Sequence, residues 1–165
     1  MALAISHSRR IKSPLGELTL CANDNQLCAV LWAEQALSHQ AKSFEVARDQ
    51  ANTVLDAAAE QLDAYFAGSR LPFSLPLAAA GTVFQQQVWS ALQATEYGET
   101  LSYGELAERL GRPQAARAVG RAVGSNLLAM VIPCHRIVGK NGQLTGFAGG
   151  LQRKRWLLAL ESQPR

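Results

Sequence analysis

The residues best suited to chemistry in this chain are Pro133, Cys134, His135 and Arg136, which follow one another at the end of an apolar stretch. A cysteine is nucleophilic as its thiolate, and a neighbouring imidazole or cation can lower the thiol pKa from its ordinary value of about 8.5. His135 and Arg136 supply both kinds of neighbour. The alternative is a small apolar side chain in a buried strand, and the local sequence does not exclude it.

A carboxylate near the end of the chain could complete a nucleophile-base pair. Residues 149–161 predict a helix that starts after two glycines. Glu161, late in that helix, could orient an imidazole as the third member of a catalytic group. The run Arg153, Lys154 and Arg155 near the start of the same helix is typical of a solvated face.

Further helices are predicted before the cysteine. Thr82 is suited to cap one of them, and Ser102 with Glu105 forms a capping box for a helix over residues 102–110. Residues 114–124 predict another short helix directly after it. Two short helices joined by a tight, glycine-containing turn are typical of a helix-turn-helix.

The helix predicted at residues 114–124 consists mainly of alanine and glycine, with Arg117 and Arg121 on one face. Small side chains allow a partner to approach the helix backbone closely. A packed helix-helix interface inside the protein would explain the alanines equally well. The two arginines favour a phosphate-bearing partner, because they can contact a polyanion without obstruction.

Residues 1–80 predict a separate α/β domain. Residues 16–22 and 26–32 read as the two strands of a hairpin, and residues 52–66 follow a helical period. Prolines and a glycine just before residue 81 are typical of a connecting segment. We therefore expect a domain boundary there, with a second, mainly α-helical domain over residues 81–165.

The composition indicates a globular protein with a small positive charge. The 165 residues include 16 basic and 13 acidic side chains, which is compatible with a polyanionic partner without requiring one. A soluble, cytoplasmic protein without membrane contact is expected, because there is no signal peptide, no long apolar run and an odd number of cysteines. No metal site is expected, since His7, Cys21, Cys28 and His39 include no closely spaced ligand pair.

Several ordered motifs resemble those of one known family. They are Ala116-Arg117-Ala118-Val119-Gly120, Asn126, Ile132-Pro133-Cys134-His135-Arg136, Gly146-Phe147-Ala148-Gly149-Gly150 and Glu161. In this order and spacing, residues 82–161 closely resemble the O6-alkylguanine-DNA alkyltransferases, with the bacterial single-function branch nearest. A weaker match near the N-terminus rests on Ser13-Pro14-Leu15-Gly16 and the predicted hairpin. The resemblance implies a ribonuclease-H-like N-terminal domain of structural role and a C-terminal helix-turn-helix domain that binds DNA and carries the active site.

The resemblance also implies a reaction, the irreversible transfer of an alkyl group from the O6 oxygen of damaged guanine to Cys134. O4-alkylthymine is a second candidate substrate, and no cofactor is needed. His135, acting through a water, would take the thiol proton, and Glu161 would hold His135 in the useful tautomer. Asn126 would keep the active-site loop in shape.

The implied partner is double-stranded DNA containing O6-alkylguanine, bound by a monomer. The target atom cannot be reached inside a stacked duplex, so the nucleotide must rotate into a pocket. The resemblance implies that Arg117 fills the vacated space and that Tyr103 pushes the phosphate and contacts the flipped base. The residues implied to bind DNA are Tyr103, Ala116, Arg117, Ala118, Gly120 and Arg121, and those implied to line the substrate pocket are Val123, Ile137, Phe147 and Ala148.

Two of these positions depart from the family pattern. Phe147 stands where many members have tyrosine, so it keeps a stacking face and loses a hydroxyl. We expect activity to be retained and substrate preference to be affected. Ala148 stands where some members have serine, but it keeps the backbone N–H that points toward the guanine oxygen.

Two other functions fit part of the sequence. A non-catalytic helix-turn-helix lesion sensor would bind damaged DNA without chemistry, but family members of that kind replace the cysteine, and Cys134 is present. A cysteine hydrolase would use the same set of cysteine, histidine and acid with turnover. That function leaves the arginine-bearing helix unexplained.

Overall fold

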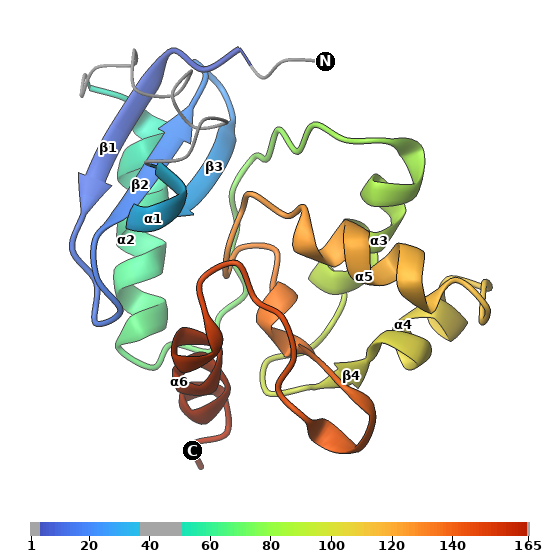
Figure 1. Cartoon of the computed structure of the whole chain (residues 1–165). Coiled ribbons are helices and arrows are strands. Elements are labelled where there is room, and N and C mark those ends of the chain that lie inside the picture. Colours follow the sequence, from blue (N-terminus) through green and yellow to red (C-terminus); the bar gives the residue numbers. More distant parts are fainter. Residues whose placement is uncertain (1–3, 37–50, 165) are drawn as a thin grey trace. The chain divides into compact units, whose positions relative to one another are not determined.

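The computed structural model describes residues 4–36 and 51–164. The chain divides into two compact units, Met1–Ala80 and Gly81–Arg165 (Figure 1). His39, considered above as a metal ligand, lies outside the described residues.

The first unit is built on a three-stranded antiparallel sheet in the order β1-β2-β3 (Figure 1). The strands are β1 (His7–Ile11), β2 (Leu18–Ala22) and β3 (Leu27–Trp32). β2 and β3 form the predicted hairpin, with Leu18 opposite Trp32. β1 was not predicted from the sequence, because this edge strand is polar, mostly half-buried and lacks the alternation of a strand with one apolar face.

The helix that covers the sheet is connected to the hairpin turn by a side-chain hydrogen bond. The short helix α1 (Ala33–Ala36) follows β3, and α2 (Thr53–Phe66) packs against the strands. The Asn52 side chain caps α2 by accepting a hydrogen bond from the backbone N–H of Leu55 at 2.9 Å. Its amide nitrogen lies 3.3 Å from the Asn23 carbonyl oxygen in the hairpin turn. Asn52 therefore fixes where α2 starts relative to the sheet.

The segment after α2 extends the sheet by a short parallel contact. The backbone N–H of Leu27 donates to the Pro76 carbonyl at 2.8 Å, and the Ala78 N–H donates to the Leu27 carbonyl at 2.9 Å. The connecting segment predicted from its prolines thus lies along the start of β3.

Three helices form the body of the second unit: α3 (Val83–Gln93), α4 (Tyr103–Arg109) and α5 (Ala116–Gly124). α3 and α4 both begin with a full capping box, Thr82 with Gln85 and Ser102 with Glu105. Each box satisfies backbone N–H groups that have no partner inside the helix, so these starts are set locally.

α5 is held between the other two helices, since both α3 and α4 pack against it (Figure 1). Its buried side chains are Val119, Ala122 and Val123. The indole N–H of Trp89 in α3 donates to the Ala122 carbonyl at 2.9 Å, which fixes the position of α5 on α3.

The rest of the second unit arranges the segment that contains Cys134. β4 (Leu101–Ser102) pairs in parallel with β5 (Ile137–Val138), and the 3-10 turn η2 (Cys134–Arg136) immediately precedes β5. A second 3-10 turn, η3 (Lys140–Gly142), leads to the loop before α6 (Leu151–Glu161). α6 packs against η2.

Among the residues that the structure describes, no helix is long and apolar enough to cross a membrane. Within the same residues, no group of three or more His, Cys, Asp and Glu side chains could hold a metal ion.

The N-terminal cap of α2 gives a stability prediction. Replacing Asn52 by alanine removes the cap and its contact with the hairpin turn, which should lower the free energy of unfolding by about 1–2 kcal/mol. Glu60→Ala, on the exposed face of α2, should change it by less than about 0.5 kcal/mol. Urea unfolding followed by circular dichroism measures both variants, and equal effects would show that the cap does not stabilise the helix.

Candidate active site

The segment before Cys134 is shaped by the buried side chain of Asn126, which follows α5. Its amide nitrogen donates to the Ile132 carbonyl at 2.8 Å, and its oxygen accepts from the backbone N–H of Leu128 at 2.9 Å. The Ile132 N–H donates to the Leu128 carbonyl at 2.8 Å. Met130, at the tip, has a φ of 68°, which is uncommon for a residue with a side chain. Asn126 therefore braces a tight, partly strained turn.

Pro133 redirects the chain so that the next three residues form η2. The Cys134 N–H donates to the Ile132 carbonyl at 2.8 Å across Pro133, whose φ of −80° and ψ of 67° are those of an inverse γ-turn. The Arg136 N–H then donates to the Pro133 carbonyl at 3.1 Å. Cys134 thus lies at the start of a tight turn rather than in the buried strand considered as the alternative.

Cys134, His135 and Arg136 are all buried, and the two basic side chains share one carboxylate. His135 Nε2 lies 2.6 Å from Glu161 Oε2, and Arg136 Nε donates to Glu161 Oε1 at 2.8 Å. The same Oε1 accepts the backbone N–H of Gly98 at 3.2 Å. Arg136 also donates to the carbonyl and hydroxyl oxygens of Thr95, at 2.9 and 3.0 Å. Glu161, at the end of α6, therefore anchors η2.

The protonation states follow from these contacts. Burial acts to raise the pKa of Glu161, but the hydrogen bonds and charges of His135 and Arg136 outweigh it and lower the pKa to about 2. Burial, together with the charges of Arg136 and Lys154, lowers the pKa of His135 despite the hydrogen bond and charge of Glu161. A neutral imidazole beside a carboxylate must donate from Nε2, so Nδ1 carries the lone pair that can accept a proton.

The expectation that His135 and Arg136 lower the thiol pKa is wrong for this structure. Burial raises the pKa of Cys134 above its ordinary value. The groups that oppose burial are the Asn126 side chain, the charge of Lys154 and backbone N–H groups. His135 and Arg136 are directed to Glu161, so the thiol is held neutral and needs a base to become nucleophilic.

α5 presents its two arginines outward. Arg117 and Arg121 are exposed, and Ala116 and Ala118 are partly covered. Gly120 faces the Tyr103 ring: a Cβ atom there would lie 3.6 Å from two ring carbons, an ordinary contact distance. Gly120 therefore supports the packed helix-helix interface, and the face with Arg117 and Arg121 is exposed.

The predicted pocket residues differ in their surroundings. Val123 is buried in α5, and Ile137 is fully buried in β5 opposite Leu101. Phe147 is half-buried, and Ala148 is exposed in the loop before α6. The loop is tied to α4, since Tyr103 Oη lies 3.2 Å from the Thr145 hydroxyl.

Two functional candidates were missed or misassigned from the sequence. Arg136 was considered only as a neighbour of the thiol, but it binds the carboxylate that orients His135. Lys154 was assigned to a solvated face, yet only 1% of it is exposed. The spacing of Lys154, Leu157 and Glu161 could have revealed this, because positions three and seven residues apart share a helical face.

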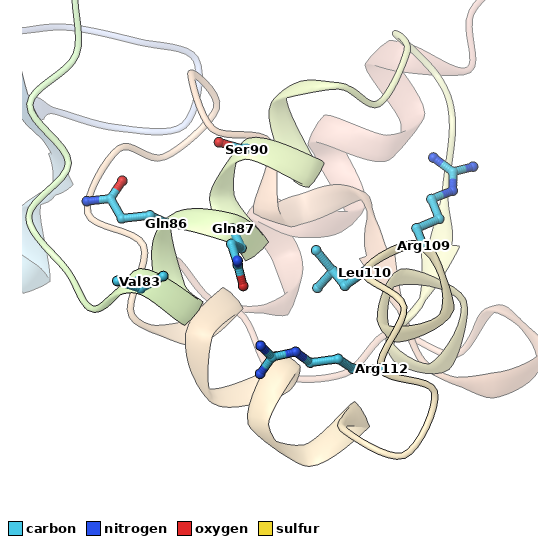
Figure 2. Close-up of a pocket in the computed structure, with 7 residues that line it drawn as sticks. All are labelled: Val83, Gln86, Gln87, Ser90, Arg109, Leu110 and Arg112. Atoms are coloured by element: carbon cyan, nitrogen blue, oxygen red, sulfur yellow. The ribbon is translucent and has the colours of Figure 1, made fainter.

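A separate hollow lies beside α3 and the end of α4, with a volume of about 600 Å³ (Figure 2). Its lining residues are Val83, Gln86, Gln87, Ser90, Arg109, Leu110 and Arg112. The Arg112 guanidinium lies 5.3 Å from the centre of the Phe84 ring, and Arg109 pairs with Glu99. This hollow includes none of the catalytic, DNA-binding or pocket residues predicted from the sequence.

Comparison with protein families identifies the class to which this fold and site belong. Residues 83–163 match the 6-O-methylguanine DNA methyltransferase DNA-binding domain, and residues 7–79 match the 6-O-methylguanine DNA methyltransferase ribonuclease-like domain. The protein thus has a small N-terminal sheet domain and a helical C-terminal DNA-binding domain.

Individual relatives agree with this assignment. The methylated-DNA--protein-cysteine methyltransferase of Mycobacterium tuberculosis strain H37Rv is 46% identical over 158 residues, covering 94% of this chain and 92% of the relative. The enzyme of the same name from Shigella flexneri is 44% identical over 162 residues, covering 92% and 93%.

Solved structures agree as well. The crystal structure of M. tuberculosis O6-methylguanine methyltransferase matches with a TM-score of 0.84 and 46% identity, covering 94% of this chain and 92% of that one. The crystal structure of M. tuberculosis OGT in complex with DNA has a TM-score of 0.82 and 45% identity, with the same coverage. The chain belongs to the 6-O-methylguanine DNA methyltransferase family, and the resemblance noted in its sequence is confirmed.

The buried carboxylate gives a pH-dependent prediction. Glu161→Gln leaves Arg136 buried without its counter-charge, so we expect a loss of about 3 kcal/mol in the free energy of unfolding at neutral pH. Because the pKa of Glu161 is lower in the folded protein, its stabilisation is complete above the unfolded-state value of about 4.3. The stabilisation is then lost as the pH falls toward the folded pKa of about 2.

Urea unfolding from about pH 7 to about pH 3 measures the difference between the wild type and Glu161→Gln. That difference should shrink below about pH 4.3, and Glu108→Gln, at an exposed position of α4, is the control. A difference that stays constant over this range would contradict an ionised Glu161 stabilised by its two basic partners.

Proposed function

We propose that this protein repairs DNA by direct damage reversal, moving the alkyl group of an O6-alkylguanine in double-stranded DNA to the sulfur of its own Cys134. The observation that carries the proposal is the buried pair of His135 with Glu161, at 2.6 Å, in which His135 directly follows Cys134 in η2. The chain belongs to a methyltransferase family, and two of its relatives are named methylated-DNA--protein-cysteine methyltransferase. This name supports the assignment.

The proposed reaction begins with removal of the thiol proton. A water between Cys134 and His135 passes that proton to Nδ1, and Glu161 stabilises the imidazolium that forms. The thiolate attacks the alkyl carbon, the bond from that carbon to O6 breaks and its electron pair goes to the purine. The purine takes back one proton and becomes guanine. The step needs no cofactor.

The product explains why each molecule would act once. The new C–S bond is a thioether, which has no good leaving group. Cys21 and Cys28 are buried in the sheet of the N-terminal unit, and burial raises the pKa of Cys21 to about 12. We assign that unit a structural role and place the activity in a monomer in the cytoplasm, where thiols stay reduced.

DNA recognition is assigned to α4 and α5 as a helix-turn-helix. α5 would lie in the minor groove, where the exposed Arg117 fills the space left by the flipped nucleotide and Arg121 contacts phosphate. Tyr103, at the start of α4, would push the phosphate and contact the flipped base. The small side chains of Ala116 and Ala118 would let the helix approach the groove floor.

The flipped base would be held by the loop before α6 and by the segment after η2. Phe147 would stack on the base, and the Ala148 N–H would face the guanine oxygen. Val123 and Ile137 would contribute to the apolar wall that limits the size of the alkyl group. O4-alkylthymine is the second substrate to test, because it presents an alkyl group on an equivalent exocyclic oxygen.

Intact-mass analysis tests the central step. After mixing with duplex DNA containing O6-methylguanine, the protein should gain one methyl group, located on Cys134, and Cys134→Ser should gain none. Cys28→Ala, at a buried thiol of β3, should still gain one. Tight binding of damaged DNA without a gain in mass would instead support a non-catalytic lesion sensor, and turnover beyond one equivalent would support a hydrolase.

The role of α5 is tested by comparing two substrates. Arg117→Ala should slow repair in duplex DNA by at least about tenfold more than the reaction with a free O6-alkylguanine base, because extrusion of a base costs a few kcal/mol. Arg121→Ala should lower the affinity for duplex DNA and make that affinity depend less on salt concentration. It should have little effect on the rate of repair at saturating protein. Single-turnover rates with both substrates measure this, and equal losses for Arg117→Ala would contradict a role in flipping.

A further inference from the structure

The chain between α3 and β4 contains a tight turn, Glu96–Glu99. The Glu99 N–H donates to the Glu96 carbonyl at 3.0 Å, and the Glu99 carboxylate accepts the Glu96 N–H at 2.9 Å. Gly98, the third residue of the turn, has a φ of 84°, a conformation that favours glycine. The Glu99 carboxylate also pairs with Arg109, so α4 helps to hold the turn in place.

This segment binds the end of α6 and the groups around its carboxylate. The carbonyl and hydroxyl oxygens of Thr95, just before the turn, accept from Arg136 at 2.9 and 3.0 Å. The Tyr97 hydroxyl donates to the carbonyl of the residue before Glu161 at 3.3 Å. The Gly98 N–H donates to Glu161 Oε1 at 3.2 Å. Three of four consecutive residues therefore contact the buried carboxylate or its neighbours.

The two oxygens of Glu161 have different partners. Oε1 accepts from the Gly98 N–H and from Arg136 Nε, whereas Oε2 lies 2.6 Å from His135 Nε2. Glu161 is only 3% exposed, so its carboxylate has little access to bulk water. Because a carboxylate group is planar, donors that fix Oε1 also set the direction in which Oε2 meets His135.

A side chain at position 98 would disturb this arrangement. A Cβ atom there would lie 2.9 Å from the backbone carbonyl oxygen of Glu161, closer than such atoms approach one another in proteins. The oxygen belongs to the helix backbone, so it cannot give way unless the end of α6 moves. At Gly68, which also has a positive φ, an added Cβ would meet nothing within 4 Å. Position 98 thus requires glycine both for its φ and for its contact with Glu161.

We propose that Gly98 is a positioning residue of the alkyl-transfer site: its N–H holds Glu161 Oε1, and its lack of a side chain lets the turn approach α6, so that Oε2 stays on His135 Nε2. This role rests on the proposed function, in which His135 accepts the thiol proton at Nδ1. Gly98 acts only through Glu161 and exchanges no proton, so the proton balance of the reaction is unchanged.

The test adds one methyl group at position 98. Gly98→Ala should displace Glu161 Oε2 from His135 and slow single-turnover repair of an O6-methylguanine duplex by about tenfold or more. The direct readout is the low-field proton resonance of the His135 ring N–H in its short bond to the carboxylate, recorded without DNA. His135→Asn identifies this resonance by its loss. In Gly98→Ala it should move upfield and exchange faster with water.

Two further variants separate the contact with Glu161 from backbone strain. Gly68→Ala is the matched control, because Gly68 has a φ of 100° and open space around it. It should leave the His135 resonance and the repair rate as in the wild type. Gly98→Asn keeps the contact with the Glu161 carbonyl, but asparagine tolerates a positive φ better than alanine. It should shift the resonance in the same way, and it replaces Gly98→Ala if that variant is unfolded by circular dichroism.

Three results would overturn the proposal. The first is a folded Gly98 variant with the wild-type His135 resonance, whatever its repair rate. The second is a Gly68→Ala protein that loses as much as the Gly98 variants. The third is a wild-type His135, labelled with nitrogen-15, that carries its proton on Nδ1 instead of Nε2.

The two readouts also distinguish this proposal from the one on which it rests. The His135 resonance reports the contact with Glu161 in the absence of DNA. If the wild type gains no methyl group from damaged duplex, the proposed repair function fails, while the resonance still decides whether Gly98 positions Glu161 on His135.

Discussion

A single buried carboxylate determines how the catalytic segment is arranged. Glu161 accepts from His135, Arg136 and the Gly98 N–H, so it fixes η2 against α6 and against the chain before β4. Burial acts to raise the pKa of Glu161, but the hydrogen bonds and charges of its two basic partners outweigh it and lower the pKa. An ionised acceptor at this position also selects the tautomer of His135, which makes its far nitrogen a base.

The same burial that strengthens these contacts keeps the nucleophile inactive. A buried thiol prefers its neutral form, so the pKa of Cys134 is raised despite the basic residues that follow it in the sequence. This suits a protein that can react only once, because a permanently ionised Cys134 would be open to oxidation and to unrelated electrophiles. In the proposed reaction, activation then depends on His135, which Glu161 at the end of α6 holds in place.

In the proposed mechanism, α6 positions the groups of the chemical step and α5 presents the groups that contact DNA. α6 presents Lys154 and Glu161 on one buried face and thereby positions the groups around the thiol. The hydrogen bond from the Trp89 indole to the Ala122 carbonyl fixes α5 on α3. Arg117 and Arg121 of α5 are exposed. Rigid helices hold both sets of groups, which is the arrangement expected when a flipped nucleotide must meet a preorganised site.

Much of this protein was determined by its sequence alone. The capping boxes before α3 and α4, the hairpin of β2 and β3 and the order of motifs around Cys134 are local patterns, and they predicted the elements and the family. Tertiary structure decided the partner of Arg136, the inward direction of Lys154, the edge strand β1 and the direction of the Cys134 pKa. These depend on burial and on residues distant in the chain, such as Thr95 and Glu161 for Arg136. A short sequence motif specifies which reactive and charged side chains are available. Only packing determines which of these side chains are buried away from water and which charged residues lie next to them.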